Sequence, residues 1–188
     1  MTAISSSEAE AIAALKCELA AEVLRSSGKL RLQVMGWSML PSILPSDTLM
    51  IERTTGKQIS KGDIILFRRD GRLFVHRVVT PAYRSDDSHR DDLRRDDVQT
   101  SNLQRDDLQI ITQGDGIAWP DPPVSESQVL GKISSIERNG RLIEPRKNLD
   151  FPQRAVSLLV RRSCSAARLV AGINGMRRRA EADESCRS

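Results

Sequence analysis

The chain has 188 residues, which is enough for one domain with a hydrophobic core and too few for two. Its net charge is only +4, and it contains two Trp, one Tyr and three Phe, so the core must depend on Leu, Ile and Val. Because no aromatic residues are interleaved with the basic ones, base stacking is not available and the composition argues against a nucleic-acid partner.

The cysteines and the hydropathy pattern narrow the protein class further. Cys17, Cys164 and Cys186 lie far apart, which predicts neither a disulfide framework nor a metal site and favours a reducing compartment. The sequence has no run of 18 apolar residues, and its start lacks the basic region of a signal peptide. We therefore expect a cytoplasmic protein without a transmembrane helix, attached to a membrane at most peripherally.

Residues 7–24 carry apolar side chains at spacings of three and four, which predicts an amphipathic helix. Its expected apolar face consists of Ile12, Leu15, Leu19 and Val23. A serine at position 5, 6 or 7 would cap its start, and Gly28 would end it.

The middle of the chain is predicted to be mostly β. Short runs rich in Leu and β-branched residues alternate with turn residues. The expected strands are residues 30–34, 48–52, 63–68, 73–79, 109–112, 129–137 and 142–143. Residues 69–72 form a predicted hairpin turn because Gly71 can adopt a positive φ, and Asn139-Gly140 predicts a second turn. The expected fold is a curled antiparallel sheet flanked by an N-terminal and a C-terminal helix.

A charged segment, residues 84–108, interrupts this pattern. It contains three copies of an Arg-Asp-Asp-Leu/Val unit, at residues 90–93, 95–98 and 105–108. These units are too polar to bury a face, so we interpret the segment as a low-complexity insertion in a surface loop. The alternative, an Asp-rich calcium loop, lacks the glycine and the closing glutamate of such loops.

Residues 152–179 predict a second, basic amphipathic helix. Apolar side chains fall on one face, with most arginines elsewhere. The apolar residues are Val156, Leu159, Val160, Ala167, Val170 and Ile173. Such a helix could dock on the domain, pair with another chain or lie on an anionic membrane.

Residues 36–41, Gly-Trp-Ser-Met-Leu-Pro, form the first candidate chemical motif. A glycine two residues before a serine allows the backbone to turn sharply and to approach a substrate closely, which would expose the Ser38 hydroxyl. A serine hydroxyl needs a base to become a nucleophile, and an imidazole suits that task. Of the two histidines, His89 lies in the charged insertion, so His76 is the candidate base.

Two carboxylates could orient this histidine. Asp115 follows a glycine in Gln113-Gly114-Asp115-Gly116, and Asp121 lies six residues further on. A carboxylate beside an imidazole holds its tautomer and stabilises its cation. Asp63, which follows Gly62, is better explained as a turn former.

The order and spacing of these motifs resemble the superfamily of signal peptidase I and LexA-like serine peptidases. Residues 36–41 resemble its nucleophile box, and Gly62-Asp63 before an apolar strand resembles its next box. His76-Arg77-Val78 is similar to the archaeal and endoplasmic-reticulum branch, which uses a Ser-His-Asp triad. Gly114-Asp115 with Asp121 also reproduces the spacing of that branch. The resemblance covers roughly residues 30–136.

The resemblance implies a role for each motif residue. Ser38 would be the nucleophile, His76 the general base, Asp121 the acid that orients it, and Asp115 a supporting carboxylate. The nucleophile box and oxyanion hole would comprise Gly36, Ser38, Met39 and Pro41. Because Gly36 stands where the family usually has a side-chain donor, the oxyanion hole would depend on backbone N–H groups, that of Ser38 first.

We therefore expect residues 1–29 to form an N-terminal helix, residues 30–150 a catalytic domain with the insertion, and residues 151–188 a basic helix and tail. The resemblance implies an endopeptidase that cleaves an extended peptide or protein substrate after small residues such as Ala, with no metal or organic cofactor. The alternatives are a LexA-like protein that cleaves itself or a partner, and a silent peptide-binding module. A lysine base such as Lys61 would replace His76 if the branch is misassigned.

Overall fold

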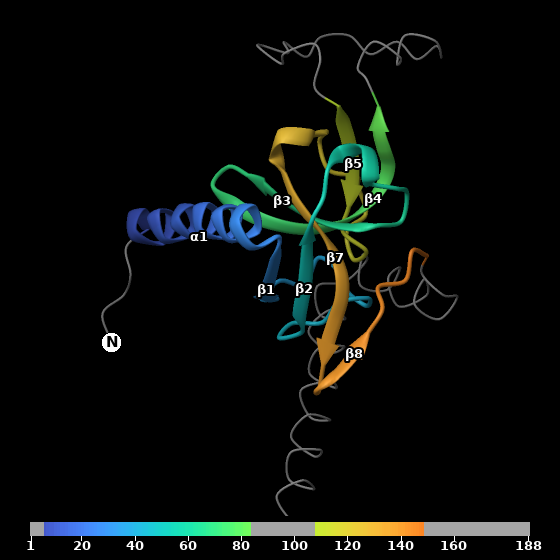
Figure 1. Cartoon of the computed structure of the whole chain (residues 1–188), viewed down its shortest axis with the longest axis horizontal. Coiled ribbons are helices and arrows are strands. Elements are labelled where there is room, and N and C mark those ends of the chain that lie inside the picture. The colour runs from blue at the N-terminus through green and yellow to red at the C-terminus, as the bar shows by residue number, and fades with distance from the viewer. Residues whose placement is uncertain (1–5, 84–107, 149–188) are drawn as a thin grey trace, which may run out of the picture.

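The computed structural model of the chain describes residues 6–83 and 108–148 (Figure 1). Most of the charged insertion and the whole predicted C-terminal helix therefore lie outside the described residues. The boundary expected between the catalytic domain and that helix, at residue 150, also lies outside them. Among the described residues, no helix combines the length and the apolar character needed to cross a membrane.

The described strands form one antiparallel sheet, which confirms the mainly β prediction. Its order is β1-β2-β7-β3-β4-β5-β6, and β8 pairs with β7. The strands are β1 Lys29–Gln33, β2 Thr48–Arg53, β3 Ile64–Arg69, β4 Arg72–Tyr83, β5 Gln109–Gln113, β6 Val124–Ser125, β7 Val129–Arg138 and β8 Arg141–Ile143. In Figure 1, the antiparallel pair β4 and β5 extends to the upper end of the sheet, whereas β8 lies at the lower end. The two-residue β6 was not predicted, because so short a strand has no alternation to detect.

Both predicted hairpin turns are present and have the expected backbone. Asp70 and Gly71 join β3 to β4 with φ values of 50° and 67°, and Asn139 and Gly140 join β7 to β8 with 51° and 70°. Two consecutive positive φ values match the twist of the flanking strands, which is why Asp-Gly and Asn-Gly are favoured at these positions.

The N-terminal helix is present as α1, Ser6–Ser27, and ends at Gly28 as predicted. Gly28 adopts a φ of 73°, and its N–H donates to the carbonyl of Leu24 at 3.0 Å. A glycine with left-handed backbone conformation after the last turn is a common helix end.

The predicted apolar face of α1 was wrong. The buried side chains are Cys17, Ala20 and Leu24. Leu15 and Leu19 are 69% and 62% exposed, Ile12 is also exposed, and Val23 is half-buried. Residues at 17, 20 and 24 also share one helical face, and the small side chains of the first two allow α1 to approach β1 and β4 closely. Hydrophobicity alone therefore selected the wrong face.

Two apolar clusters lie against the sheet. The inner cluster consists of Leu24, Met39, Ile43, Leu49, Ile51, Ile64, Leu66, Ile133 and Ile136. The outer cluster consists of Ile59, Ile65, Phe67, Val78, Ile110 and Val124. Along β3, successive residues alternate between the two clusters, so all four apolar residues of this central strand are buried. This packing fixes β3 and the adjoining β4, which carries His76.

Candidate active site

Ser38 lies in the loop that joins β1 to β2. The loop is held by its buried apolar residues Met39, Leu40 and Ile43, and the N–H of Ile43 donates to the carbonyl of Met39 at 3.0 Å. At the far end of the loop, the carboxylate of Asp47 accepts a hydrogen bond from the N–H of Leu44 at 2.8 Å. The backbone around Ser38 is thus anchored from both sides.

Asp47 also ties this loop to the sheet. Its side chain is fully buried and pairs with the guanidinium of Arg138 on β7, with an N–O distance of 2.6 Å. The same guanidinium donates to the carbonyl of Ser42 at 2.9 Å. A buried carboxylate needs such a partner, because an unpaired charge in the interior is very costly.

The turn predicted at Gly36 does not use a left-handed backbone conformation. The φ of Gly36 lies outside the left-handed region, so the loop does not depend on glycine for its turn. A Cβ built on Gly36 would meet no atom within 4 Å. The glycine leaves open space beside Ser38, on the wall of a cleft described below.

Ser38, His76 and Asp121 form a continuous hydrogen-bonded series. The Nε2 of His76 lies 3.0 Å from the Oγ of Ser38, and its Nδ1 lies 2.6 Å from the Oδ2 of Asp121. His76 is buried on β4, whereas Asp121 lies in the loop between β5 and β6. If the Nδ1–H donates to the carboxylate, the lone pair of Nε2 can accept the proton of the serine hydroxyl. This arrangement can support nucleophilic chemistry at Ser38.

Thr112 positions Asp121 and was missed in the sequence. Its hydroxyl donates to the Oδ2 of Asp121 at 2.6 Å, and its carbonyl accepts the N–H of Asp121 at 2.8 Å. Thr112 is fully buried on β5. The only signal in the sequence is a polar β-branched residue near the end of an apolar strand, which is too common to identify a site.

The carboxyl group of Asp121 is stabilised in its ionised form. Burial, the largest single influence, acts to raise the pKa of Asp121. The hydrogen bonds from His76 and Thr112, together with the charges of His76 and Arg69, outweigh burial, so the pKa of Asp121 is lowered. Asp121 is therefore suited to remain a carboxylate and to stabilise a protonated His76.

Asp115 lies nearby but has a different partner. Its two carboxylate oxygens accept from the Nε and one terminal nitrogen of Arg77, both at 2.8 Å. Arg77 also donates to the carbonyl of Gly62 at 2.9 Å and to the hydroxyl of Ser42 at 3.2 Å. The buried Asp115–Arg77 pair thus connects the loop after β5 to the loop that carries Ser38.

Gly114 and Gly116 bring these two loops into direct contact. The N–H of Gly116 donates to the carbonyl of Ser38 at 2.8 Å. A Cβ on Gly114 would lie 2.6 Å from that same carbonyl oxygen, which is closer than real Cβ contacts. Gly114 is therefore needed for this close approach, a role that its place in a Gly-Asp-Gly turn did not reveal.

An open cleft of about 730 Å³ leads to Ser38. Its walls include residues of β1 and the first residues of β4, and α1 closes one side. Most lining side chains are apolar, and Lys16 and Arg31 are the charged residues among those lining it in the described part of the chain.

The other candidate residues do not join the site. The side chain of Lys61 is exposed, and within the described residues no lysine hydrogen-bonds to Ser38. Asp63 accepts from the N–H of Ser60 at 2.9 Å and pairs with Lys132 at 3.3 Å, as expected of a turn former. Residues 6–83 and 108–148 contain no group of three or more His, Cys, Asp or Glu arranged to hold a metal ion.

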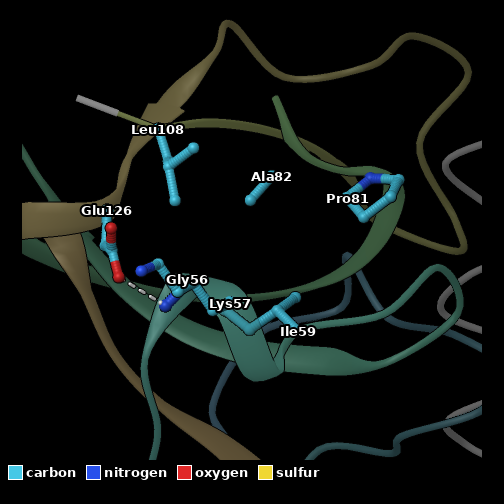
Figure 2. A pocket seen from close by; sticks show the side chains of 7 residues that line it. All are labelled: Gly56, Lys57, Ile59, Pro81, Ala82, Leu108 and Glu126. Atoms are coloured by element: carbon cyan, nitrogen blue, oxygen red, sulfur yellow. Dashed lines mark hydrogen bonds between the residues drawn. The ribbon is translucent and has the colours of Figure 1, made fainter. Parts of the chain in front are cut away.

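A second pocket, of about 460 Å³, lies away from Ser38 and is shown in Figure 2. It is lined by Gly56, Lys57, Ile59, Pro81, Ala82, Leu108 and Glu126. Figure 2 shows the carboxylate of Glu126 directed toward the backbone N–H of Gly56, and this hydrogen bond measures 2.7 Å. Its acidic group is thus already bonded, and none of the candidate catalytic residues lies here.

Comparison with known proteins gives one family match. The Peptidase S24-like family model matches residues 2–88, a segment that includes Ser38 and His76 and ends before Asp115 and Asp121. No curated protein matches the chain. The match supports a relation to the superfamily of LexA-like and signal peptidases, and hence to serine-peptidase-type hydrolases in general.

Proposed function

We propose that this protein is a serine endopeptidase that hydrolyses peptide bonds through an acyl-enzyme. The observation that carries the proposal is the hydrogen-bonded series from Asp121 through His76 to Ser38. The family match is consistent with it, although that family includes inactive members. The series has the order and the roles of a nucleophile, a base and an orienting acid.

In the proposed reaction, the Oγ of Ser38 attacks the substrate carbonyl while the Nε2 of His76 accepts the hydroxyl proton. Asp121 stabilises the imidazolium that forms. The tetrahedral intermediate collapses, the C–N bond breaks, and His76 donates the proton to the leaving amine. A water molecule, deprotonated by His76, then attacks the ester carbonyl and releases the acid product and Ser38.

The backbone N–H of Ser38 is the first candidate for the oxyanion hole. Within the described residues the structure records no hydrogen-bond acceptor for it. A backbone donor held in a rigid loop can stabilise the negative charge that develops on the carbonyl oxygen. The adjoining loop residues Met39 and Pro41 contribute by fixing this backbone, and Met39 is buried in the inner cluster.

The substrate would bind as an extended strand. In the described sheet β1 pairs only with β2, and residues 72–76 of β4 pair only with β3. Both free edges line the cleft that leads to Ser38. An extended peptide can use its backbone N–H and C=O groups on such edges. The preference for a small residue before the scissile bond, implied by the resemblance, is part of this proposal.

Two other functions compete with this one. A LexA-like protein would cleave itself or one partner once, and a silent module would bind peptides without cleavage. The placement of Ser38, His76 and Asp121 within hydrogen-bonding distance favours a catalyst, because a binding module needs none of these contacts.

Labelling with a fluorophosphonate probe tests the proposal. We expect the probe to modify Ser38. Ser38→Ala should abolish both labelling and peptidase activity without changing the midpoint of the unfolding transition. Ser134→Ala, which removes an exposed hydroxyl on β7, should still label and serves as the matched control. Labelling of another residue, or Ser38→Ala activity within about tenfold of wild type, would remove the claim.

A further inference from the structure

The sheet has no strand between β1 and the first residues of β4, and α1 packs against both while its Leu24 belongs to the buried inner cluster. The pairing β1-β2-β7-β3-β4 curls the inward faces of these strands around the cluster and leaves β1 and the first residues of β4 as its two edges. The cleft that leads to Ser38 is lined by both edges. A core bounded by two unpaired edges can accept one more strand.

The side chains along these edges are incompletely buried for the same reason. Leu30 and Leu32 of β1, together with Leu73 and Val75 of β4, pack against the inner cluster yet are only half-buried. They occupy alternate positions on their strands, so they share the inward face. The surface that an incoming strand would meet on this side is therefore apolar and unfilled.

The two edges of the cleft run in the same direction. β1, β2, β7, β3 and β4 are antiparallel in turn, so β1 and β4 run in the same direction, toward Ser38 and His76. A peptide that runs parallel to both brings its carboxyl end to Ser38. The residues that precede the scissile bond then lie between the two edges.

We infer that the substrate is an extended segment with large apolar side chains at two alternate positions among those preceding the scissile bond. Alternate residues of a strand point to one face, so one set would pack against the half-buried apolar side chains of β1 and β4 that line the cleft. The open cleft of about 730 Å³ is far larger than alanine side chains can fill, and apolar surface left without partner atoms loses dispersion contacts. This inference rests on the proposed function, and it concerns positions behind the residue at the cleavage point.

The test uses the full chain and synthetic peptides of three kinds. All three have Ala directly before the scissile bond. The first has Leu at the third and fifth positions before that bond and Ser at the positions between them, the second has Ala in place of each Leu, and the third has the same composition as the first with the two Leu residues adjacent. Binding is measured by fluorescence anisotropy to the Ser38→Ala protein, and kcat/KM is measured with the wild-type protein. We expect the alternating Leu peptide to exceed both others by about tenfold or more, the usual range for discrimination in an apolar pocket.

A paired variant locates the effect in the cleft. Leu32→Phe on β1 fills the space between the edges and should reduce the preference for Leu, whereas Leu142→Ala on exposed β8 should leave it unchanged. If the Leu32→Phe protein does not fold, the wild-type peptide series still decides the question. Equal use of the three peptides, or preference for the block peptide, would overturn the inference.

The outcomes separate this inference from the proposed function. Fluorophosphonate labelling of Ser38 without preference for the alternating peptide would refute the inference but would still support the proposed peptidase function. Preferred binding of the alternating peptide without labelling of Ser38 would support the peptide-binding cleft and refute the proposed catalytic function. If the protein is a dimer that dissociates in Leu32→Arg, as measured by light scattering, a second copy occupies the cleft and the inference is wrong.

Discussion

Replacing Thr112 with valine removes one of the two hydrogen bonds to the Oδ2 of Asp121 and changes the side-chain volume little. The bond is 2.6 Å long, its acceptor is charged, and Thr112 is fully buried. A hydrogen bond to a charged group contributes roughly 1.5–3 kcal/mol. We therefore expect the free energy of unfolding near neutral pH to fall by about that amount, or the melting temperature by about 3–12 °C for this chain length.

The loss should depend on pH with a definite sign. The folded state lowers the pKa of Asp121, so Asp121 contributes stability that is present above its unfolded pKa and is lost as the pH falls through its folded pKa. Removing the Thr112 hydroxyl removes one cause of that lowering, and the pKa of Asp121 should rise. The difference in stability between wild type and Thr112→Val should therefore shrink on acidification.

Urea unfolding at a series of pH values measures this difference. Thr80→Val is the matched control, because Thr80 is half-buried on β4 and its hydroxyl makes no hydrogen bond recorded among residues 6–83 and 108–148. We expect the control to change stability by no more than about 0.5 kcal/mol. A Thr112→Val loss no larger than the control, or one that grows as the pH falls, would refute the assigned hydrogen bond.

Three further predictions concern activity. His76→Ala should lower kcat by about two to four orders of magnitude, the usual contribution of a positioned base; an active variant whose rate rises only at alkaline pH would indicate a lysine base. Asp121→Asn should reduce kcat more than Asp115→Asn does, because Asp121 is the carboxylate bonded to the histidine. Asp115→Asn should mainly lower the midpoint of urea unfolding, because it breaks the buried pair with an arginine. If Asp115→Asn reduces kcat more, Asp115 is the carboxylate that supports the base. Gly114→Ala forces a Cβ against the carbonyl oxygen of Ser38, so it should lower the free energy of unfolding in urea by about 1–3 kcal/mol and should also lower kcat. The control Gly36→Ala places its Cβ in open space and should leave the urea midpoint unchanged. Equal effects of the two variants would show that the close contact at Gly114 is unimportant.

The sequence by itself determined the local structure of the sheet. Runs of Leu, Ile and Val marked most of the strands, and the Asp70-Gly71 and Asn139-Gly140 pairs marked both hairpins. These signals succeed because the preference for a positive φ or for an alternating face belongs to the residue and its close neighbours. Ser38 and His76 became candidates through their chemistry and through the order of the surrounding motifs, which resembles a known superfamily.

Tertiary structure alone decided the face of α1 and the partners of the carboxylates. Ile12 and Leu15 are more hydrophobic than Ala20, yet Ala20 is buried, because it shares with Cys17 and Leu24 the helical face that packs against the sheet. Asp115 and Asp121 both follow β5, and local preference did not say which reaches the histidine; only the resemblance to a known superfamily favoured Asp121. The structure pairs Asp121 with His76 and Asp115 with an arginine, because the loop between β5 and β6 folds back to the carbonyl of Thr112. Such pairings depend on distances between segments far apart in the chain, which local preference does not encode.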